Sequence, residues 1–303
     1  MDAYKLCIVV WLLACTGAAQ ADTTHVDAEL AASYDNNLGR AESAHDIFGD
    51  NILDFGLTVT RSMLLTPNSG LRFRGGLHLA EHAKYTDLNL VSANIGVSYR
   101  VQPVPGYVAP WIEFGAMLTR QSFNNSAIRD GRLLAMEAIA GKRLTDRIGA
   151  RVGISREQRR ADVADVFEWQ RHRIYVMADY KLDLNSTLHV SLLRDFGDQV
   201  FTTTPNLELR EYSKAIAKDP VFGVRRAYRM DAIADALELG VSTPLNSSNT
   251  LDIGLRRFHA DAVGGHSYDN TELRASWLYR FNRDFPLARD FKWKPLGQLF
   301  DFT

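Results

Sequence analysis

The chain has 303 residues, of which 46% are hydrophobic, 10% aromatic and 23% charged, and its formal net charge is −1. The hydrophobic content excludes a disordered chain, and 35 basic against 36 acidic residues give no electrostatic reason to expect nucleic acid as a partner. A mean hydropathy of −0.18 excludes a bundle of membrane helices but not a membrane β-barrel, in which apolar and polar residues alternate.

Residues 1–21 are typical of a secretory signal peptide. Lys5 provides the positive charge, residues 6–14 (LCIVVWLLA) are the apolar region, and residues 19–21 (AQA) form the cleavage site. The apolar run is shorter than the roughly 20 residues that a membrane span requires. Lipoprotein processing at Cys15 is the alternative. Both cysteines lie in this segment, so a chain cleaved after residue 21 has no thiol for a nucleophile or a zinc site.

After the leader, apolar and polar residues alternate with a period of two, as in residues 53–60 (LDFGLTVT). Twelve segments with this pattern are predicted to be strands: 25–36, 51–65, 70–82, 89–102, 106–121, 132–144, 147–158, 170–183, 186–196, 228–243, 249–260 and 271–282. Tight turns are expected at 66–70, 103–105, 145–146, 184–185 and 244–248. They alternate with longer connections at 37–50, 83–88, 122–131, 159–169, 197–227 and 261–270.

Short turns at one end, long loops at the other and an even number of strands predict an all-β fold. The predicted fold is a transmembrane antiparallel β-barrel of about 12 strands (14 possible), and its expected location is the outer membrane of a Gram-negative bacterium. A large soluble β-sandwich or barrel, which also alternates, is the alternative. The expected organisation is a signal peptide at 1–21, the barrel at 22–282 and a periplasmic tail at 283–303.

The polar faces of the strands define the expected lumen. Its predicted charged residues are Arg72, Arg74, Arg100, Glu113, Glu137, Arg143, Arg151, Asp179, Lys181, Asp252, Arg256, Arg274 and Arg280. They form either a charged pore or a set of ion pairs across the lumen, and the near balance of sign favours pairing. Twelve strands lie between the roughly eight that fill their lumen and the roughly 16 that leave a wide channel, so a narrow or partly filled pore is expected. Arg72 and Arg74 are the best candidates for an anion-attracting spot.

No catalytic motif was found in the sequence, and we expect no enzyme activity, cofactor or metal. The one hydrolase hypothesis pairs His259, Asp261 and His266 with Asp195 or Asp198. A second group of oxygen ligands, at residues 35–37 and 50, is more typical of a turn than of a calcium site.

The end of the last predicted strand resembles the signal by which outer-membrane barrels are recognised for assembly. Arg274, Tyr279 and Phe281 match it, and Ser276 replaces the usual glycine. The resemblance implies barrel assembly machinery as a partner. The signal is followed by residues 282–303 rather than by the end of the chain.

Two further stretches resemble known barrels. Residues 32–38 (ASYDNNL) resemble the first strand of certain Gram-negative barrels. Residues 219–226 (DPVFGVRR), with Arg229, Asp231 and residues 266–281, are similar to the last hairpins of surface lipoprotein assembly modifier barrels and of exopolysaccharide-export barrels. The resemblance implies an outer-membrane barrel with a secretion or polysaccharide-export partner.

The leading hypothesis is an outer-membrane pore or an export component for a polymer, a solute or a surface protein. The alternative is an accessory barrel with a filled lumen that acts through its loops, and the third is a barrel-embedded hydrolase. Outer-membrane lipid is an expected partner, and nucleic acid is not. Loop 197–227 is long enough to constrict the lumen, cap the mouth or contact a partner.

Overall fold

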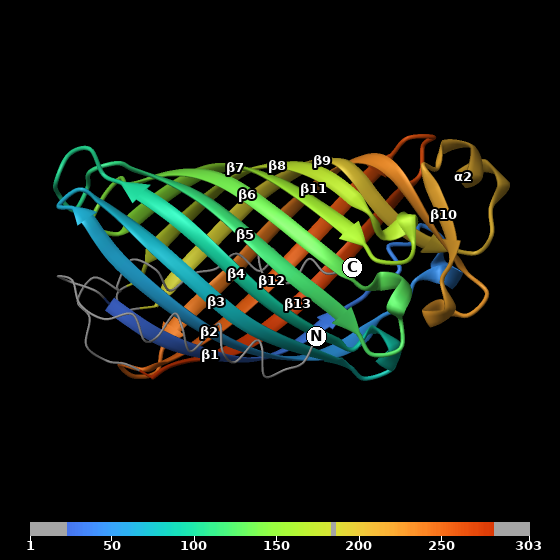
Figure 1. The fold of residues 1–303 in the computed structure, drawn as a ribbon, viewed down its shortest axis with the longest axis horizontal. Coiled ribbons are helices and arrows are strands. Elements are labelled where there is room, and N and C mark those ends of the chain that lie inside the picture. The colour runs from blue at the N-terminus through green and yellow to red at the C-terminus, as the bar shows by residue number, and fades with distance from the viewer. Residues whose placement is uncertain (1–22, 183–185, 282–303) are drawn as a thin grey trace.

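The structure is a computed structural model that describes residues 23–182 and 186–281, so the predicted signal peptide and C-terminal tail lie outside it (Figure 1). The strands in these residues are β1 (Thr23–Asp35), β2 (Asp50–Thr66), β3 (Ser69–His82), β4 (Leu90–Val101), β5 (Trp111–Phe123), β6 (Gly131–Arg143), β7 (Ile148–Ala161), β8 (Trp169–Lys181), β9 (Thr187–Thr203), β10 (Ala215–Lys218), β11 (Arg226–Pro244), β12 (Asn249–Ala262) and β13 (Ser267–Arg280).

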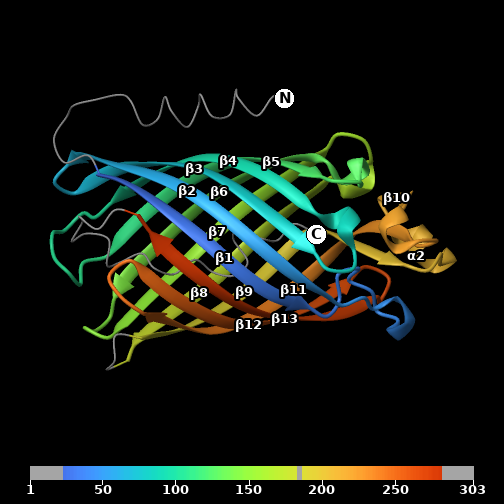
Figure 2. The same cartoon turned by 90° about the horizontal axis from the view of Figure 1, so that it is seen from below.

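The strands of the described residues form one antiparallel sheet that closes on itself. Strands β1 to β9 pair in chain order, β11 to β13 continue the sheet, and β13 pairs with β1 (Figure 2). The second closing seam is the pairing of β11 with β9, which leaves β10 outside the ring. Twelve strands therefore close the barrel, and the predicted fold class is confirmed.

The alternation of the sequence separates two faces of the barrel wall. On β2, Leu53 and Phe55 are 50% and 44% exposed, whereas Asp54 between them is 4% exposed. The other strands repeat this pattern, with large apolar side chains outside and charged side chains buried inside. An apolar outer surface around a closed sheet is stable only where lipid replaces water.

Two connections differ from their predicted lengths. The connection at 103–105 is expected to be tight, but it runs from 102 to 110 because β5 begins at Trp111, after three prolines. The connection at 261–270 is expected to be long, but it spans only 263–266. Gly264 and Gly265 adopt φ values of +90° and +82°, which lets the chain reverse within a tight hairpin.

Strands β9 and β11 extend beyond their neighbours at the end that carries the long loops. β11 pairs with β12 only from Ala232 onward, so its six residues before that point rise above β12 together with the end of β9. We call this extension the tongue. β10 pairs with residues 226–229 along the edge that β12 leaves free, which protects the edge from other chains.

The longest connection, residues 204–225, contains helix α2 (Leu207–Tyr212), β10 and the 3-10 turn η5 (Pro220–Phe222). Further single 3-10 turns are η1 (Ala44–Asp46), η2 (Thr86–Leu88), η3 (Ala127–Arg129) and η4 (Asp165–Phe167). No helix of the described residues is long and apolar enough to cross a membrane.

Candidate functional site

A cavity of about 150 Å³ lies inside the barrel. Its charged lining residues are Arg72, Arg74, Glu113, Glu137, Arg151, Glu157 and Arg173. Glu113 accepts hydrogen bonds from Arg100 Nε at 2.8 Å and from Arg72 Nη1 at 3.5 Å. The Arg100 guanidinium also stacks on the ring of Trp111, 3.9 Å from its centroid. Three strands therefore contribute to one ionic cluster near the short-turn end of the lumen.

Positive charge exceeds negative charge in this cavity. Among the described residues that line it are four guanidinium groups and three carboxylates. Arg151 and Arg173 have further carboxylate partners in Asp179 and Asp195. No carboxylate of the described residues lies within ion-pair distance of Arg74. The predicted anion-attracting spot thus contains two guanidinium groups. Glu113 neutralises that of Arg72, whereas that of Arg74 faces the cavity without an ion pair.

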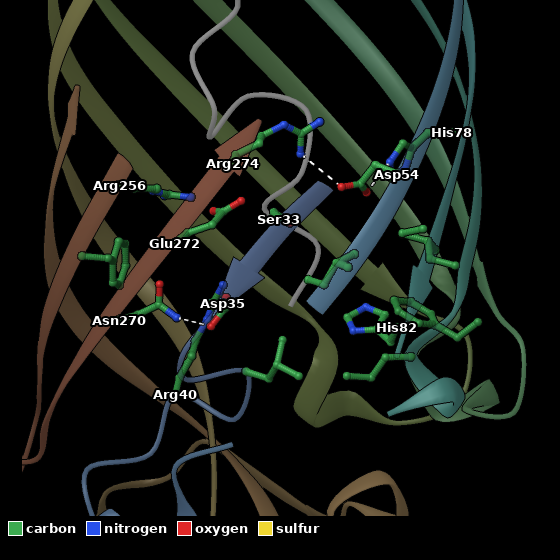
Figure 3. Close-up of a pocket in the computed structure, with 17 residues that line it drawn as sticks. Ser33, Asp35, Arg40, Asp54, His78, His82, Arg256, Asn270, Glu272 and Arg274 are labelled. Carbon is green, nitrogen blue, oxygen red and sulfur yellow. Dashed lines mark hydrogen bonds and ion pairs between the residues drawn. The ribbon is translucent and has the colours of Figure 1, made fainter. Parts of the chain in front are cut away.

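A second cavity of about 80 Å³ lies nearer the long-loop end (Figure 3). Asp54 accepts from Arg274 Nη1 at 3.2 Å, and its other oxygen lies 3.0 Å from His78 Nε2. Arg274 Nη2 donates to Glu29 at 3.0 Å. Arg274, His78 and Asp54 are all at most 4% exposed. Arg274 therefore connects β13 to β1 and β2 from inside the barrel.

The other predicted lumen residues make separate local contacts. Arg280 forms two hydrogen bonds with Asp27, at 2.7 and 3.1 Å. Asp252 accepts from Ser242 and lies 3.2 Å from His189. The remaining contacts join Arg256 to Glu238, Tyr175 to Glu137 and Arg143 to the ring of Tyr107, while Lys181 is exposed at the end of β8. Opposite charges are thus mostly distributed in pairs along the wall.

Sequence reasoning missed the most deeply buried of these pairs. Arg173 on β8 donates to both oxygens of Asp195 on β9, at 2.7 and 2.9 Å, and the two side chains are 2% and 3% exposed. Arg173, Tyr175 and Met177 are alternate residues of β8, so they lie on the same face of the strand. This spacing is the sequence signal that places Arg173 in the lumen.

The loops at the far end of the lumen meet over its mouth. Phe222 of η5 lies 5.3 Å from Phe48 and 5.2 Å from Tyr85, measured between ring centroids. Leu38 and Leu88 are buried against them. We call these five residues the mouth cluster. They come from three different loops, so residues 219–222 fold inward over the opening.

A buried ion pair anchors the same segment to the loop between β5 and β6. Arg129 of η3 donates to Asp219 at 2.5 Å, and Thr202 of β9 donates to the same oxygen at 2.9 Å. Asp219 is 0% and Arg129 6% exposed. The Arg129 guanidinium also stacks on Phe167, 4.3 Å from the ring centroid. These contacts support the prediction that loop 197–227 can cap the mouth.

Asp46 joins the first loop to the tongue. Its carboxylate accepts hydrogen bonds from the hydroxyls of Thr203 and Thr204, from the Thr204 N–H and from Arg225 Nε, at 2.6 to 2.9 Å. Burial acts to raise the pKa of Asp46, but these hydrogen bonds outweigh it and lower the pKa from 3.8 to about 2. His45 Nε2 lies 3.3 Å from the same carboxylate.

Acid is therefore expected to release the first loop from the tongue. A carboxylate with a lowered pKa stabilises the docked loop above its ordinary pKa, and this stability, roughly 2 kcal/mol, is lost as pH falls from about 4 to 2. Hydrogen exchange of residues 40–49 measures it, because exchange corrected for pH should accelerate in that window. In Asp46→Asn the exchange should already be fast at pH 6, and a wild-type loop that stays protected at pH 2 contradicts the prediction.

Among the residues of the hydrolase hypothesis, the barrel wall separates His259 and Asp261 from Asp195, whereas Asp198 pairs with Lys214 at 2.8 Å and His266 lies 3.2 Å from Glu42. The side chains of His259 and Asp261 are 46% and 71% exposed on the outer face, whereas Asp195 is buried inside against Arg173. Asp35 accepts from the N–H of Asn37, as turn residues do, and Asp50 accepts from the N–H groups of Lys84 and Tyr85 in the loop between β3 and β4. No cluster of three or more potential metal ligands occurs among the described residues.

No family model matches the sequence, and no curated protein matches it either. The structure is similar to that of an outer-membrane channel from Pseudomonas putida F1, with a TM-score of 0.58 and 12% identity over 87% of this chain and 97% of that chain. The NanC porin gives a TM-score of 0.46 at 8% identity over 83% of this chain and 98% of that one. The KdgM porin gives 0.43 at 10% identity over 84% and 99%.

The chain folds as an outer-membrane β-barrel. The closed twelve-stranded sheet within the described residues, its apolar outer face and the fold of the Pseudomonas channel all support this conclusion, and they place the protein in the outer membrane in contact with lipid. The narrower resemblance to lipoprotein assembly modifier and exopolysaccharide-export barrels is not confirmed by these matches.

Proposed function

We propose that the protein is a narrow outer-membrane pore for small hydrophilic solutes, with an extracellular mouth that its own loops close. The observation that carries the proposal is the cavity of about 150 Å³ in the lumen, lined by charged side chains from β3, β5, β6, β7 and β8. A lumen that served only to fill the barrel would not require excess positive charge beside open space. The mouth cluster and the Arg129–Asp219 pair then act as the closure.

Recording in planar lipid bilayers tests the pore. The full-length protein, folded as judged by a heat-dependent shift in gel mobility, is expected to show small conductance steps with brief openings. A protein that passes the folding check but stays silent at every voltage would instead support the accessory barrel with a filled lumen.

Arg74 is expected to set the ion preference of the pore. Arg74→Glu changes the charge of the cavity lining from one excess positive to one excess negative group, so a weak anion preference should become a cation preference of roughly a few fold. The reversal potential in a potassium chloride gradient measures this and should change sign. Arg257→Glu on the outer face of β12 is the matched control. An Arg74→Glu pore with the wild-type reversal potential contradicts the assignment.

Export of a surface protein or polymer is a second candidate. The specific observation in its favour is that residues 219–222, part of the stretch that resembles export barrels, are the ones that close the mouth. A cargo leaving through the lumen must displace this segment. Secretion of surface polymer or lipoprotein by cells that lack the protein distinguishes the candidates, since a solute pore leaves secretion unchanged.

A further inference from the structure

The outer face of β5, β6 and β7 carries a row of arginines at the end of the barrel where the long loops lie. Arg120 is paired in register with Arg132, and Arg132 with Arg160. Arg156 lies on the same face of β7 and is paired with His172 of β8. Arg132 and Arg160 are exposed, and the side chain of Arg120 is 41% exposed. We call these four residues the arginine row.

The arginine row begins where the apolar outer surface ends. Leu118, 48% exposed, is two residues from Arg120 on the same face of β5, and it is paired with Leu134 of β6. Ile154, 57% exposed, precedes Arg156 by two residues on β7. Two residues along each strand, a distance of about 7 Å, therefore separate apolar side chains that suit acyl chains from arginines that suit an anion.

Within the protein, little negative charge offsets the row. Asp162, which follows β7, contacts Arg120 at 2.5 Å and also interacts electrostatically with Arg132, and Asp130 is the other carboxylate that acts on Arg120. Among the described residues, no hydrogen bond or ion pair involves the side chains of Arg132, Arg156 or Arg160. Like charges directly opposite one another on adjacent strands are destabilising. The arrangement is stable when an external anion lies between the guanidinium groups.

The opposite wall has a different character at the same end of the barrel. There Asp235, His259 and Asp269 are paired in register across β11, β12 and β13. Asp235 is held by Arg194 at 2.6 Å, and Asp269 lies 3.2 Å from His259. On this wall positive and negative side chains thus alternate, whereas the arginine row carries side chains of one sign.

From this placement we propose that the arginine row binds the phosphate groups of an outer-leaflet glycolipid of the lipid A type. Guanidinium groups bind phosphate through two parallel N–H···O bonds, and several of them at the boundary of the apolar surface match a lipid that carries phosphates above its acyl chains. The acyl chains would lie along Leu118, Leu134 and Ile154. The proposal rests on the position of the barrel in the outer membrane and not on conduction through its lumen.

Native mass spectrometry of the full-length protein in detergent tests the proposal, with diphosphorylated lipid A and the same lipid without phosphates as probes. The wild type should retain the phosphorylated lipid roughly tenfold or more tightly than the dephosphorylated one. Arg132→Gln with Arg160→Gln should remove this preference, and the corresponding lysine pair should restore part of it because the charge remains.

The matched control is Arg257→Gln, which changes an exposed arginine on the outer face of β12 and should leave lipid binding unchanged. All three substituted positions are on the surface. Folding is checked by the heat-dependent gel shift, and Arg160→Gln alone is available if the pair does not fold. Equal affinity for both lipids, or full displacement of lipid A by millimolar inorganic phosphate, would overturn the proposal. A silent pore in bilayers would leave it standing.

Discussion

Asp219→Ala is expected to open the extracellular mouth. The substitution leaves the guanidinium of Arg129, which is 6% exposed, without its carboxylate partner, and breaking one side of a buried pair costs about 3–5 kcal/mol. This cost destabilises the docked position of residues 219–222 and should release Phe222 from the mouth cluster. In planar bilayers the fraction of time spent open should rise at least tenfold over the wild type.

Limited proteolysis gives an independent measurement, because residues 204–225 should become cleavable in Asp219→Ala. The control is Asp231→Ala, which removes an exposed partner of Lys214 at 2.6 Å on the same tongue and should change neither property. Removing both charges with Arg129→Ala and Asp219→Ala should restore part of the closure. An Asp219→Ala pore that conducts like the wild type and resists protease would contradict closure of the mouth by residues 219–222.

Arg274→Leu is expected to weaken the seam between β13 and β1. Arg274 neutralises Glu29 and Asp54, at 3.0 and 3.2 Å, in a place where it is 3% exposed. Its loss leaves two carboxylates facing each other in the lumen, with a cost of about 3–5 kcal/mol in unfolding free energy. Urea unfolding of the protein refolded into lipid vesicles measures this cost.

Refolding into vesicles also separates stability from recognition, because no assembly machinery is present. If Arg274 acts only through the assembly signal, Arg274→Leu should refold with wild-type stability but fail to accumulate in the outer membrane of cells. Arg274→Lys keeps one charge and should recover part of the stability. Arg257→Gln, on the outer face of the neighbouring β12, should unfold at the wild-type urea concentration.

The barrel strands could be predicted from the sequence because lipid and lumen impose a strict alternation on each of them. The ends of β9 and β11 could not, because the alternation stops there. Residues 199–202 on β9 are all buried, since loops and β10 cover the face that lipid covers lower down. The sequence predicts a long loop around Gly264 and Gly265, but their positive φ values allow a tight turn.

The same alternation predicts which charged residues face the lumen, but it does not predict which of them form ion pairs with one another. Arg72 and Glu113 are 41 residues apart, and Arg129 and Asp219 are 90 apart, so only the strand order brings them together. Phe48, Tyr85 and Phe222 lie in loops without periodicity, and nothing local in the sequence marks them as neighbours.

The tongue has a mechanical consequence for the closure. Its six extra residues on β11 make a rigid arm about 20 Å long, and the chain passes from this arm directly into residues 219–222. An external protein that binds the tip of the tongue would therefore pull on the segment that carries Asp219, the partner of Arg129.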